Sequence, residues 1–318
     1  MGLPLSVARQ KNAIEANCTL HTQSIMDPQT TSAITCAWPT VVDYADKLLN
    51  SNFTVSLVGA LAGAYAGAIA AQRIAERSRF RDETLREIRN VNAAIMAAFT
   101  ICNTALSLKK QLVGPMYTRF ERAKEDYLKF IEQRRTGQRQ GNAPYAFEAD
   151  LQTFMIPAMP IDTLKALLFE KVNAQDRALA LISLIDNAAT GLRQSSGKRE
   201  SLIDMFKANP PPPDVLPLHY FGQKLPSGHT HREYADIVGI VHSYTDDLIF
   251  FSADLCSELS KYGKALRTEF IKRHKGAPTI TEPDFDGPRK TGLFPKEENY
   301  SSWRSWIIEK PAVKQGKQ

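Results

Sequence analysis

The stretch from Phe53 to Ala71 reads FTVSLVGALAGAYAGAIAA and contains nineteen residues without a charge. As a helix it would rise about 28 Å, which is close to the thickness of the hydrocarbon core of a bilayer. It lies far from the start of the chain and runs directly into charged, helix-forming sequence, unlike a cleaved signal peptide. The stretch therefore predicts a single transmembrane helix over 53–71.

Three glycines in this stretch, Gly59, Gly63 and Gly67, recur at every fourth residue. That spacing places them on one helix face, where another membrane helix can approach closely. The pattern predicts a glycine zipper and a homo-oligomer. Because the stretch also contains seven alanines, its drive to insert is weak. The alternative is an Ala/Gly-rich helix buried in a soluble core.

Several basic residues follow the predicted span, whereas the twenty residues before it contain one basic residue, Lys47. By the positive-inside rule, the C-terminal side is cytoplasmic and the N-terminus lies outside. The net charge of +6 is modest and does not indicate nucleic-acid binding. The arginines that carry the orientation signal are Arg73, Arg77, Arg79 and Arg81, followed by Arg86 and Arg89.

The chain has four cysteines, too few for a disulfide scaffold. Cys18 and Cys36 fall in the arm expected outside the membrane, whereas Cys102 and Cys256 fall in helices expected in the cytoplasm. A disulfide is therefore chemically permitted only between Cys18 and Cys36. Two unpaired thiols in a flexible arm are the alternative.

Apolar residues outside the span follow helical periods, so the predicted fold class is all-α. We expect the transmembrane helix to continue into a cytoplasmic helical bundle or coiled-coil stalk. The segment 1–52 contains an irregular, polar N-terminal arm and, from Thr40, the start of the long helix, and a Pro-rich, Trp-bearing tail occupies 276–318. The bundle is expected over 72–275, with helices at 72–113, 116–135, 162–208 and 230–275.

Several residues predict where these helices begin and end. Gly114 and Pro115 predict a helix stop, and Ser195–Gly197 predicts a pause. Prolines 210–213 predict a stiff spacer in the polyproline II conformation. Thr230 and Glu233 have the spacing of a capping box at the start of the last helix.

Two apolar seams with alternating spacings of three and four run from Leu85 to Val113 and from Tyr234 to Leu266. Asn92 occupies a position of the first seam where a polar residue can fix register or oligomeric state. The alternative is that Asn92 faces a wet gap between helices. Asp246 and Asp247 are adjacent, so their side chains diverge, and we expect them on a solvated face.

The sequence contains no phosphate-binding loop, dinucleotide fingerprint, nucleophile elbow or zinc-protease motif. We therefore assign no catalytic residue and no cofactor. The best cluster for chemistry is His219, His229 and His231, which could hold Zn²⁺ if the segment is extended. Loop and helix-cap chemistry around Thr230 is the favoured interpretation of that cluster.

The tail contains an apolar group centred on Trp303 and Trp306. Three roles are open for it: packing onto the bundle, docking to a protein partner, or contact with the membrane interface.

The sequence as a whole predicts a membrane-anchored, self-associating helical scaffold or accessory protein that acts through protein–protein contacts. Its expected partners are the lipid bilayer, further copies of itself and an unidentified protein bound by the bundle or tail. One alternative is a signal-triggered membrane-perturbing effector or transmembrane sensor, favoured by the weak span. Another is a metal-dependent enzyme with an unfamiliar helical site at the histidines.

Overall fold

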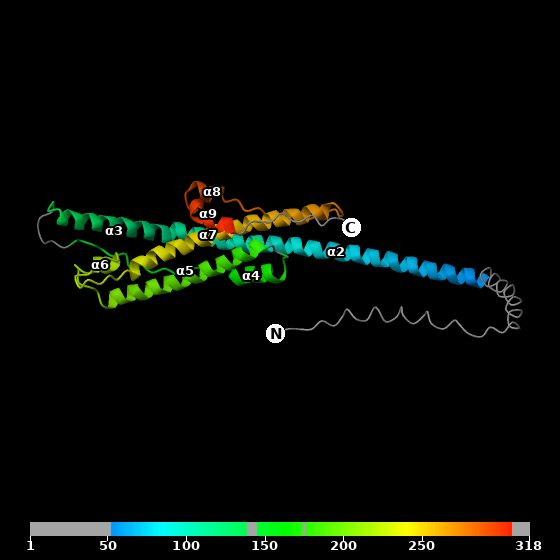
Figure 1. Cartoon of the computed structure of the whole chain (residues 1–318), viewed down its shortest axis with the longest axis horizontal. Helices are drawn as coiled ribbons and strands as arrows, with labels where there is room; N and C mark the ends of the chain where they lie inside the picture. Colours follow the sequence, from blue (N-terminus) through cyan, green and yellow to red (C-terminus); the bar gives the residue numbers. More distant parts are fainter. Residues whose placement is uncertain (1–51, 139–144, 174–175, 307–318) are drawn as a thin grey trace, which may run out of the picture. The chain divides into compact units, whose positions relative to one another are not determined.

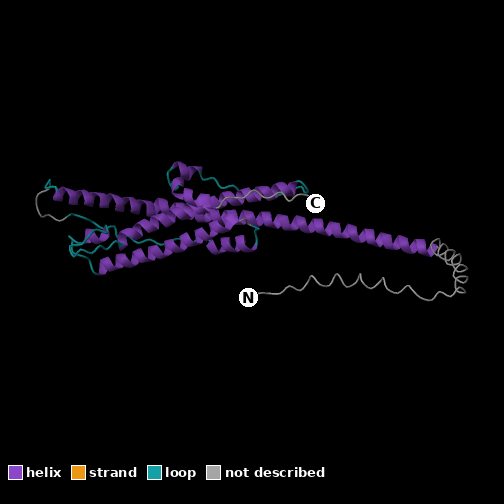
Figure 2. Ribbon diagram, in the orientation of Figure 1, coloured by secondary structure: helices purple, strands orange, loops and turns teal. Residues whose placement is uncertain are grey.

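The computed structural model describes residues 52–138, 145–173 and 176–306. These residues are mostly helical and include no strand, which confirms the all-α prediction for this part of the chain (Figure 2). The chain divides into two units, Met1–Glu76 and Arg77–Gln318. The arm at 1–51 and the end of the tail at 307–318 lie outside the described residues.

The described part of the first unit is entirely helical and begins helix α2 (Asn52–Leu108). From Ser56 to Glu76 no side chain is buried. Leu61 is 62% exposed and Tyr65 is 71% exposed. A continuous apolar helix surface of this kind marks a membrane or protein contact in a folded protein. The span predicted from sequence is therefore a helix whose apolar surface is open.

One helix of the described chain, from Ser56 to Arg135, is long and apolar enough to cross a membrane by length and composition alone. Its qualifying 18-residue window has a mean hydropathy of 1.5 and is 50% buried. Since no residue from Ser56 to Glu83 is buried, that window falls further along, where α2 enters the core of the second unit. Burial thus distinguishes the open apolar stretch at the start of α2 from its core-forming stretch.

The second unit is a helical bundle in which helix α7 (Glu233–Ile271) is the central element (Figure 1). One contiguous apolar core joins its helices. The elements other than α2 and α7 are the π-helical turn η1 (Lys109–Val113), α3 (Gly114–Arg135), α4 (Ile161–Glu170), α5 (Asp176–Ala208), α6 (Leu216–Tyr220), α8 (Asp286–Lys290), the 3₁₀ turn η2 (Glu297–Tyr300) and α9 (Ser301–Trp306).

Helix α7 runs antiparallel to α2. The Cys102 thiol of α2 donates a hydrogen bond to the carbonyl of Ile249 at 3.6 Å. About two turns further along α7, the Cys256 thiol donates to the carbonyl of Ile95 at 3.7 Å. Helix α5 also lies antiparallel to α7, so α7 is buried on more than one side. Together with the chain after α7, whose Tyr300 stacks on Phe250, this explains why α7 buries residues outside the seam from Tyr234 to Leu266.

The helix stop expected at Gly114 and Pro115 is wrong. Helix α2 passes through η1 into α3 without a loop. In η1 the Gly114 amide donates to the carbonyl of Lys109, five residues earlier. A π-helical turn inserts an extra residue and rearranges the carbonyls that a proline ring would otherwise meet. Pro115 then occupies the first turn of α3, where a missing amide proton costs little.

Two other helix boundaries differ from the prediction. The helix expected over 162–208 is two helices, α4 and α5. Helix α5 continues through Ser195–Gly197, where a pause was expected. Burial of Leu192 on one side and Leu202 on the other outweighs the loss of about 1 kcal/mol that an interior glycine causes.

Gly191 sets the close approach of α5 to α7. A methyl group at this position would overlap Cζ of Tyr244 and lie 2.6 Å and 2.8 Å from its Cε2 and Cε1 atoms. We expect Gly191→Ala to lower the free energy of unfolding by about 1–3 kcal/mol, because the tyrosine ring must move. The matched control is Gly197→Ala in the same helix, where an added methyl meets nothing within 4 Å. Chemical denaturation should show that the control is neutral or stabilising by up to about 1 kcal/mol. Equal effects of the two substitutions would contradict this packing.

Candidate functional site

The chain after α7 turns back and lies along α7 and α2. Gly276 has φ of +81°, which glycine adopts without strain, and it begins this return. Asn92 of α2 then binds the returning backbone through both the nitrogen and the oxygen of its side-chain amide. Its amide nitrogen donates to the carbonyl of Thr279 at 2.8 Å, and its amide oxygen accepts from the Thr281 nitrogen at 3.0 Å. We call residues 276–303 the strap.

This geometry gives Asn92 a role that the seam did not indicate. Its amide group binds the backbone of the strap in its own chain. Between the two hydrogen bonds, Ile280 packs over Gly263 of α7 and beside Val91 of α2. A methyl added at Gly263 would lie 3.0 Å from both neighbours, so glycine leaves the room that Ile280 fills.

Replacing Asn92 by alanine should loosen the strap and leave the helices folded. The two hydrogen bonds are expected to contribute about 1–3 kcal/mol between them. Hydrogen exchange of the Thr281 amide should accelerate, since Asn92 is its acceptor. Asn103→Ala, at an exposed position of the same helix, is the control and should leave exchange of the strap unchanged. Unaltered exchange at Thr281 in Asn92→Ala would show that other contacts hold the strap.

The far end of the strap packs on α7 through aromatic rings. Tyr300 stacks on Phe250 with ring centres 3.8 Å apart, and its hydroxyl donates to Asp247 at 2.9 Å. Trp303 meets Phe251 edge-on at 5.3 Å, and the guanidinium of Arg177 lies 5.4 Å from the indole ring. Trp303 thus packs within its own chain. The Trp306 side chain lies outside the described residues.

A partly buried polar cluster lies beside the π-helical turn. Lys109 of η1 forms an ion pair with Asp246 of α7 at 2.5 Å, with side chains 11% and 15% exposed. His242 Nδ1 lies 3.9 Å from the other carboxylate oxygen, and the His242 ring stacks on Tyr117 at 4.2 Å. The prediction that Asp246 and Asp247 lie on a solvated face is therefore wrong, since Asp246 pairs with Lys109 and Asp247 accepts a hydrogen bond from Tyr300. Lys109, the one charged residue of the seam from Leu85 to Val113, was the signal for this pair.

The same cluster should make stability depend on pH. Burial is the main cause that lowers the pKa of His242, and Lys109 lowers it further, while Asp246 acts in the opposite direction. Below the ordinary value of 6.5, the unfolded chain then binds more protons than the folded one, so stability is lost as pH falls. We expect His242→Gln to reduce this loss, as measured by denaturant unfolding from pH 8 to pH 5. The control His229→Gln, on an exposed loop, should leave this loss of stability unchanged. Identical pH profiles for His242→Gln and the parent protein would refute the role of His242.

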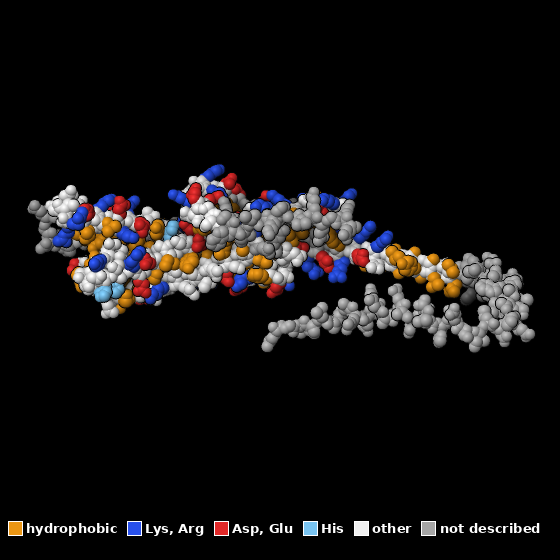
Figure 3. Space-filling view, viewed as in Figure 1, with side chains coloured by type: hydrophobic (Ala, Val, Ile, Leu, Met, Phe, Trp, Pro, Cys, Tyr) orange, Lys and Arg blue, Asp and Glu red, His pale blue; other side chains and the backbone are white. Residues whose placement is uncertain are grey.

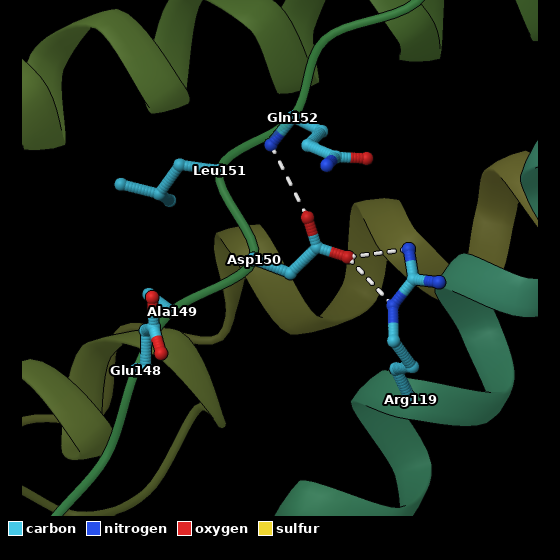
Figure 4. A pocket seen from close by; sticks show the side chains of 6 residues that line it. All are labelled: Arg119, Glu148, Ala149, Asp150, Leu151 and Gln152. Atoms are coloured by element: carbon cyan, nitrogen blue, oxygen red, sulfur yellow. Dashed lines mark hydrogen bonds and ion pairs between the residues drawn. The ribbon is translucent and has the colours of Figure 1, made fainter.

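An open pocket of about 540 Å³ lies where the segment 145–160 crosses α3. Figure 4 shows Arg119 of α3 pointing at the Asp150 carboxylate, with Leu151 directed away from it. Nε and Nη2 of Arg119 donate to one carboxylate oxygen of Asp150 at 3.0 Å and 2.7 Å. The other carboxylate oxygen accepts a hydrogen bond from the backbone nitrogen of Gln152 at 3.3 Å. Both charges are thus engaged with each other. The contacts fasten this segment to the bundle and present no arrangement for acid–base chemistry.

The structure brings together two of the three histidines proposed as metal ligands. The rings of His219 and His231 stack with centres 5.0 Å apart, and burial lowers the pKa of His219. His229 is exposed in a loop closed by a bridge between Lys224 and Thr230. Within the described ranges, no group of three His, Cys, Asp or Glu side chains could hold a metal ion.

The expected capping box is wrong, since Arg232 is the N-cap residue of α7 and makes no side-chain capping bond. Thr230 lies outside the helix in the bridged loop. Glu233 instead forms an ion pair with Lys198 of α5 at 3.0 Å. The loop bridge removes Thr230 from the position that a capping residue must occupy.

The residues assigned to the membrane lie on open parts of α2. An added methyl at Gly59, Gly63 or Gly67 would meet nothing within 4 Å. The side chains of Arg73, Arg77, Arg79 and Arg81 are exposed, and Arg79 pairs with Glu83 at 2.7 Å.

The cysteines separate into two groups. Cys102 and Cys256 are free and buried, and burial raises the pKa of Cys102 to about 11. Both thiols are therefore poorly reactive in the folded bundle. Cys18 and Cys36 lie outside the described residues. The chain matches no protein-family model, no curated protein and no solved structure.

Proposed function

We propose that this chain is a membrane-anchored helical scaffold that acts through protein–protein contacts and has no catalytic activity of its own. The helix over 53–71 crosses the bilayer once, with the arm outside and the bundle in the cytoplasm. The observation that carries the proposal is the open apolar surface of α2 from Ser56 to Ile74. Lipid is the environment in which such a surface is stable without a protein cover.

The anchor is tested by carbonate extraction combined with cysteine labelling in intact cells. After treatment with an impermeant reductant, which opens any disulfide between them, an impermeant maleimide added from outside should label Cys18 and Cys36. Cys102 and Cys256 are buried, so they should react only after denaturation. A fully soluble protein would refute the anchor, and labelling of the arm only after the membrane is opened would reverse the proposed orientation.

Self-association through the glycine face is the second part of the proposal. Gly63→Leu would place a large side chain on the face where another helix is expected to pack. Ala68→Leu adds similar bulk on the opposite side of the same helix. Crosslinking in membranes should show fewer oligomers for Gly63→Leu than for Ala68→Leu. Equal crosslinking of the two variants would refute a glycine zipper.

A membrane-perturbing effector or transmembrane sensor is the second candidate, because the seven alanines make the span weakly hydrophobic. Such a helix would rearrange in the bilayer when the bundle receives a signal. Dye entry and membrane potential after induced expression distinguish the two candidates. An intact barrier under all conditions tried would exclude the effector.

A further inference from the structure

The residues just after the end of α7 lie beside the arginine-rich stretch of α2. The guanidinium carbon of Arg273 lies 5.2 Å from the centre of the Phe80 ring. The His274 ring lies 6.3 Å from that of Phe80 and 5.0 Å from that of Phe270, which is fully buried. These contacts fix the end of α7 against α2 at Phe80, although the two stretches are far apart in sequence.

This junction concentrates most of the net charge of the chain. The stretches 77–89 and 267–275 contain nine basic and four acidic residues, a net charge of +5, whereas the whole chain carries +6. Figure 3 shows Lys and Arg side chains gathered over the end of α7 and the adjoining part of α2. We call the four exposed residues Arg77, Arg81, Arg273 and Lys275 the basic collar.

The four side chains of the basic collar are exposed, although the guanidinium of Arg273 lies over the Phe80 ring and interacts electrostatically with Glu269. Two of its neighbours are neutralised, since Arg79 pairs with Glu83 and Lys272 pairs with Glu269. The four collar residues themselves form no ion pair within the described part of the chain. Their surface also includes exposed apolar area from Ile271.

The helix macrodipole explains part of this arrangement. Cations are favoured at any helix C-terminus, and α3 also ends in Arg134 and Arg135. There, however, Arg135 is engaged by Glu132 through two hydrogen bonds of 2.9 Å and 2.8 Å. The dipole of α7 does not account for the alignment of its cationic end with Arg77 and Arg81 of another helix.

We propose that the basic collar binds anionic phospholipid headgroups at the cytoplasmic surface of the membrane. This inference rests on the proposed anchor. Arg77 follows Ala71 by six residues, which span at most about 21 Å in any conformation. Arg77 is thus held within reach of the headgroups, and Arg273 contacts Phe80 only three residues further along α2. Basic side chains at such a distance are attracted to anionic lipids. Phe80 and Ile271 supply apolar surface suited to the interface.

Lipid binding to the full-length protein in detergent tests the collar. Phosphatidylglycerol and phosphatidylcholine are titrated separately, and bound lipids are counted by native mass spectrometry. We expect tighter binding of phosphatidylglycerol, weakened by salt. The double variant Arg273→Glu, Lys275→Glu should weaken it about 25-fold or more, because each basic residue near an anionic surface contributes about five-fold. Both changes leave the arginines that set orientation untouched.

The matched control is Arg193→Glu, Lys207→Glu, which makes the same charge change at exposed positions of α5. It should bind phosphatidylglycerol as the parent protein does. If the glutamate variant of the collar melts early, the milder Arg273→Gln, Lys275→Gln variant replaces it. Equal binding of both lipids, equal loss in collar and control variants, or tighter binding of a DNA oligonucleotide would overturn the proposal. Carbonate extraction tests the anchor separately from lipid binding: if the anchor is wrong, the protein is found in the soluble fraction.

Discussion

Leu61→Arg is expected to move the full-length protein from the carbonate-resistant membrane fraction into the soluble fraction or into aggregates. Leu61 lies near the middle of the apolar stretch and is 62% exposed on α2. Replacing leucine by arginine at the centre of a membrane helix costs about 3–4 kcal/mol of insertion free energy. A span with seven alanines has little insertion free energy to spare, so a single charge should be sufficient.

Gln72→Arg is the control for Leu61→Arg, because it adds the same charge just beyond the apolar stretch. It should remain fully membrane-integrated, since a basic residue on the flank proposed to be cytoplasmic agrees with the positive-inside rule. Membrane integration of Leu61→Arg equal to that of the parent would show that 53–71 is not the span. Attention would then turn to the second apolar stretch of α2, which is half buried in the bundle.

The helical character of the chain could be predicted from sequence because apolar side chains repeat with the helical period. The seam from Tyr234 to Leu266 is a clear case: Val238, Val241 and Leu248 are all buried. The helical repeat of apolar residues indicates which face of a helix is buried, and it depends only on the residues of that helix. It does not report which other elements cover α7, so the burial of Phe250 under Tyr300 and of Cys256 against α2 was not predicted.

The predicted break at Gly114 failed for a different reason. Glycine and proline preferences describe an ordinary α-helix, whereas the chain here forms a π-helical turn that tolerates both. Buried Val113 and Met116 hold the chain on either side of that turn. Local preference was therefore outweighed by packing that depends on the whole bundle.

The polar contacts of the candidate sites were beyond sequence reasoning because each joins distant segments. Asn92 was recognisable as an unusual seam residue, but its partner, the backbone at Thr279 and Thr281, carries no side-chain signature. Lys109 and Asp246 were visible individually, and only the fold makes them a pair. A buried charge among such contacts gives the strongest stability prediction for the bundle.

Arg199→Ala is expected to lower the free energy of unfolding by about 2–4 kcal/mol. Arg199 is 2% exposed, and its Nη1 donates to the carbonyl of Gln152 at 2.7 Å. Its Nη2 donates to the Tyr234 hydroxyl at 3.3 Å, and its guanidinium lies 5.5 Å from the centre of the Phe154 ring. The substitution removes these bonds and leaves a cavity under the segment 145–160.

Other contacts also hold the segment 145–160 on the bundle. Tyr234 and Tyr220 both donate to the carbonyl of Asp150, so they would continue to hold part of the segment after Arg199 is lost. Hydrogen exchange near Gln152 should therefore accelerate more than exchange in the core of α7. The neighbouring Glu200→Ala, at an exposed position of the same helix, should change stability by less than about 0.5 kcal/mol. If Arg199→Ala matches Glu200→Ala in denaturant unfolding, the buried guanidinium does not secure this segment to the bundle.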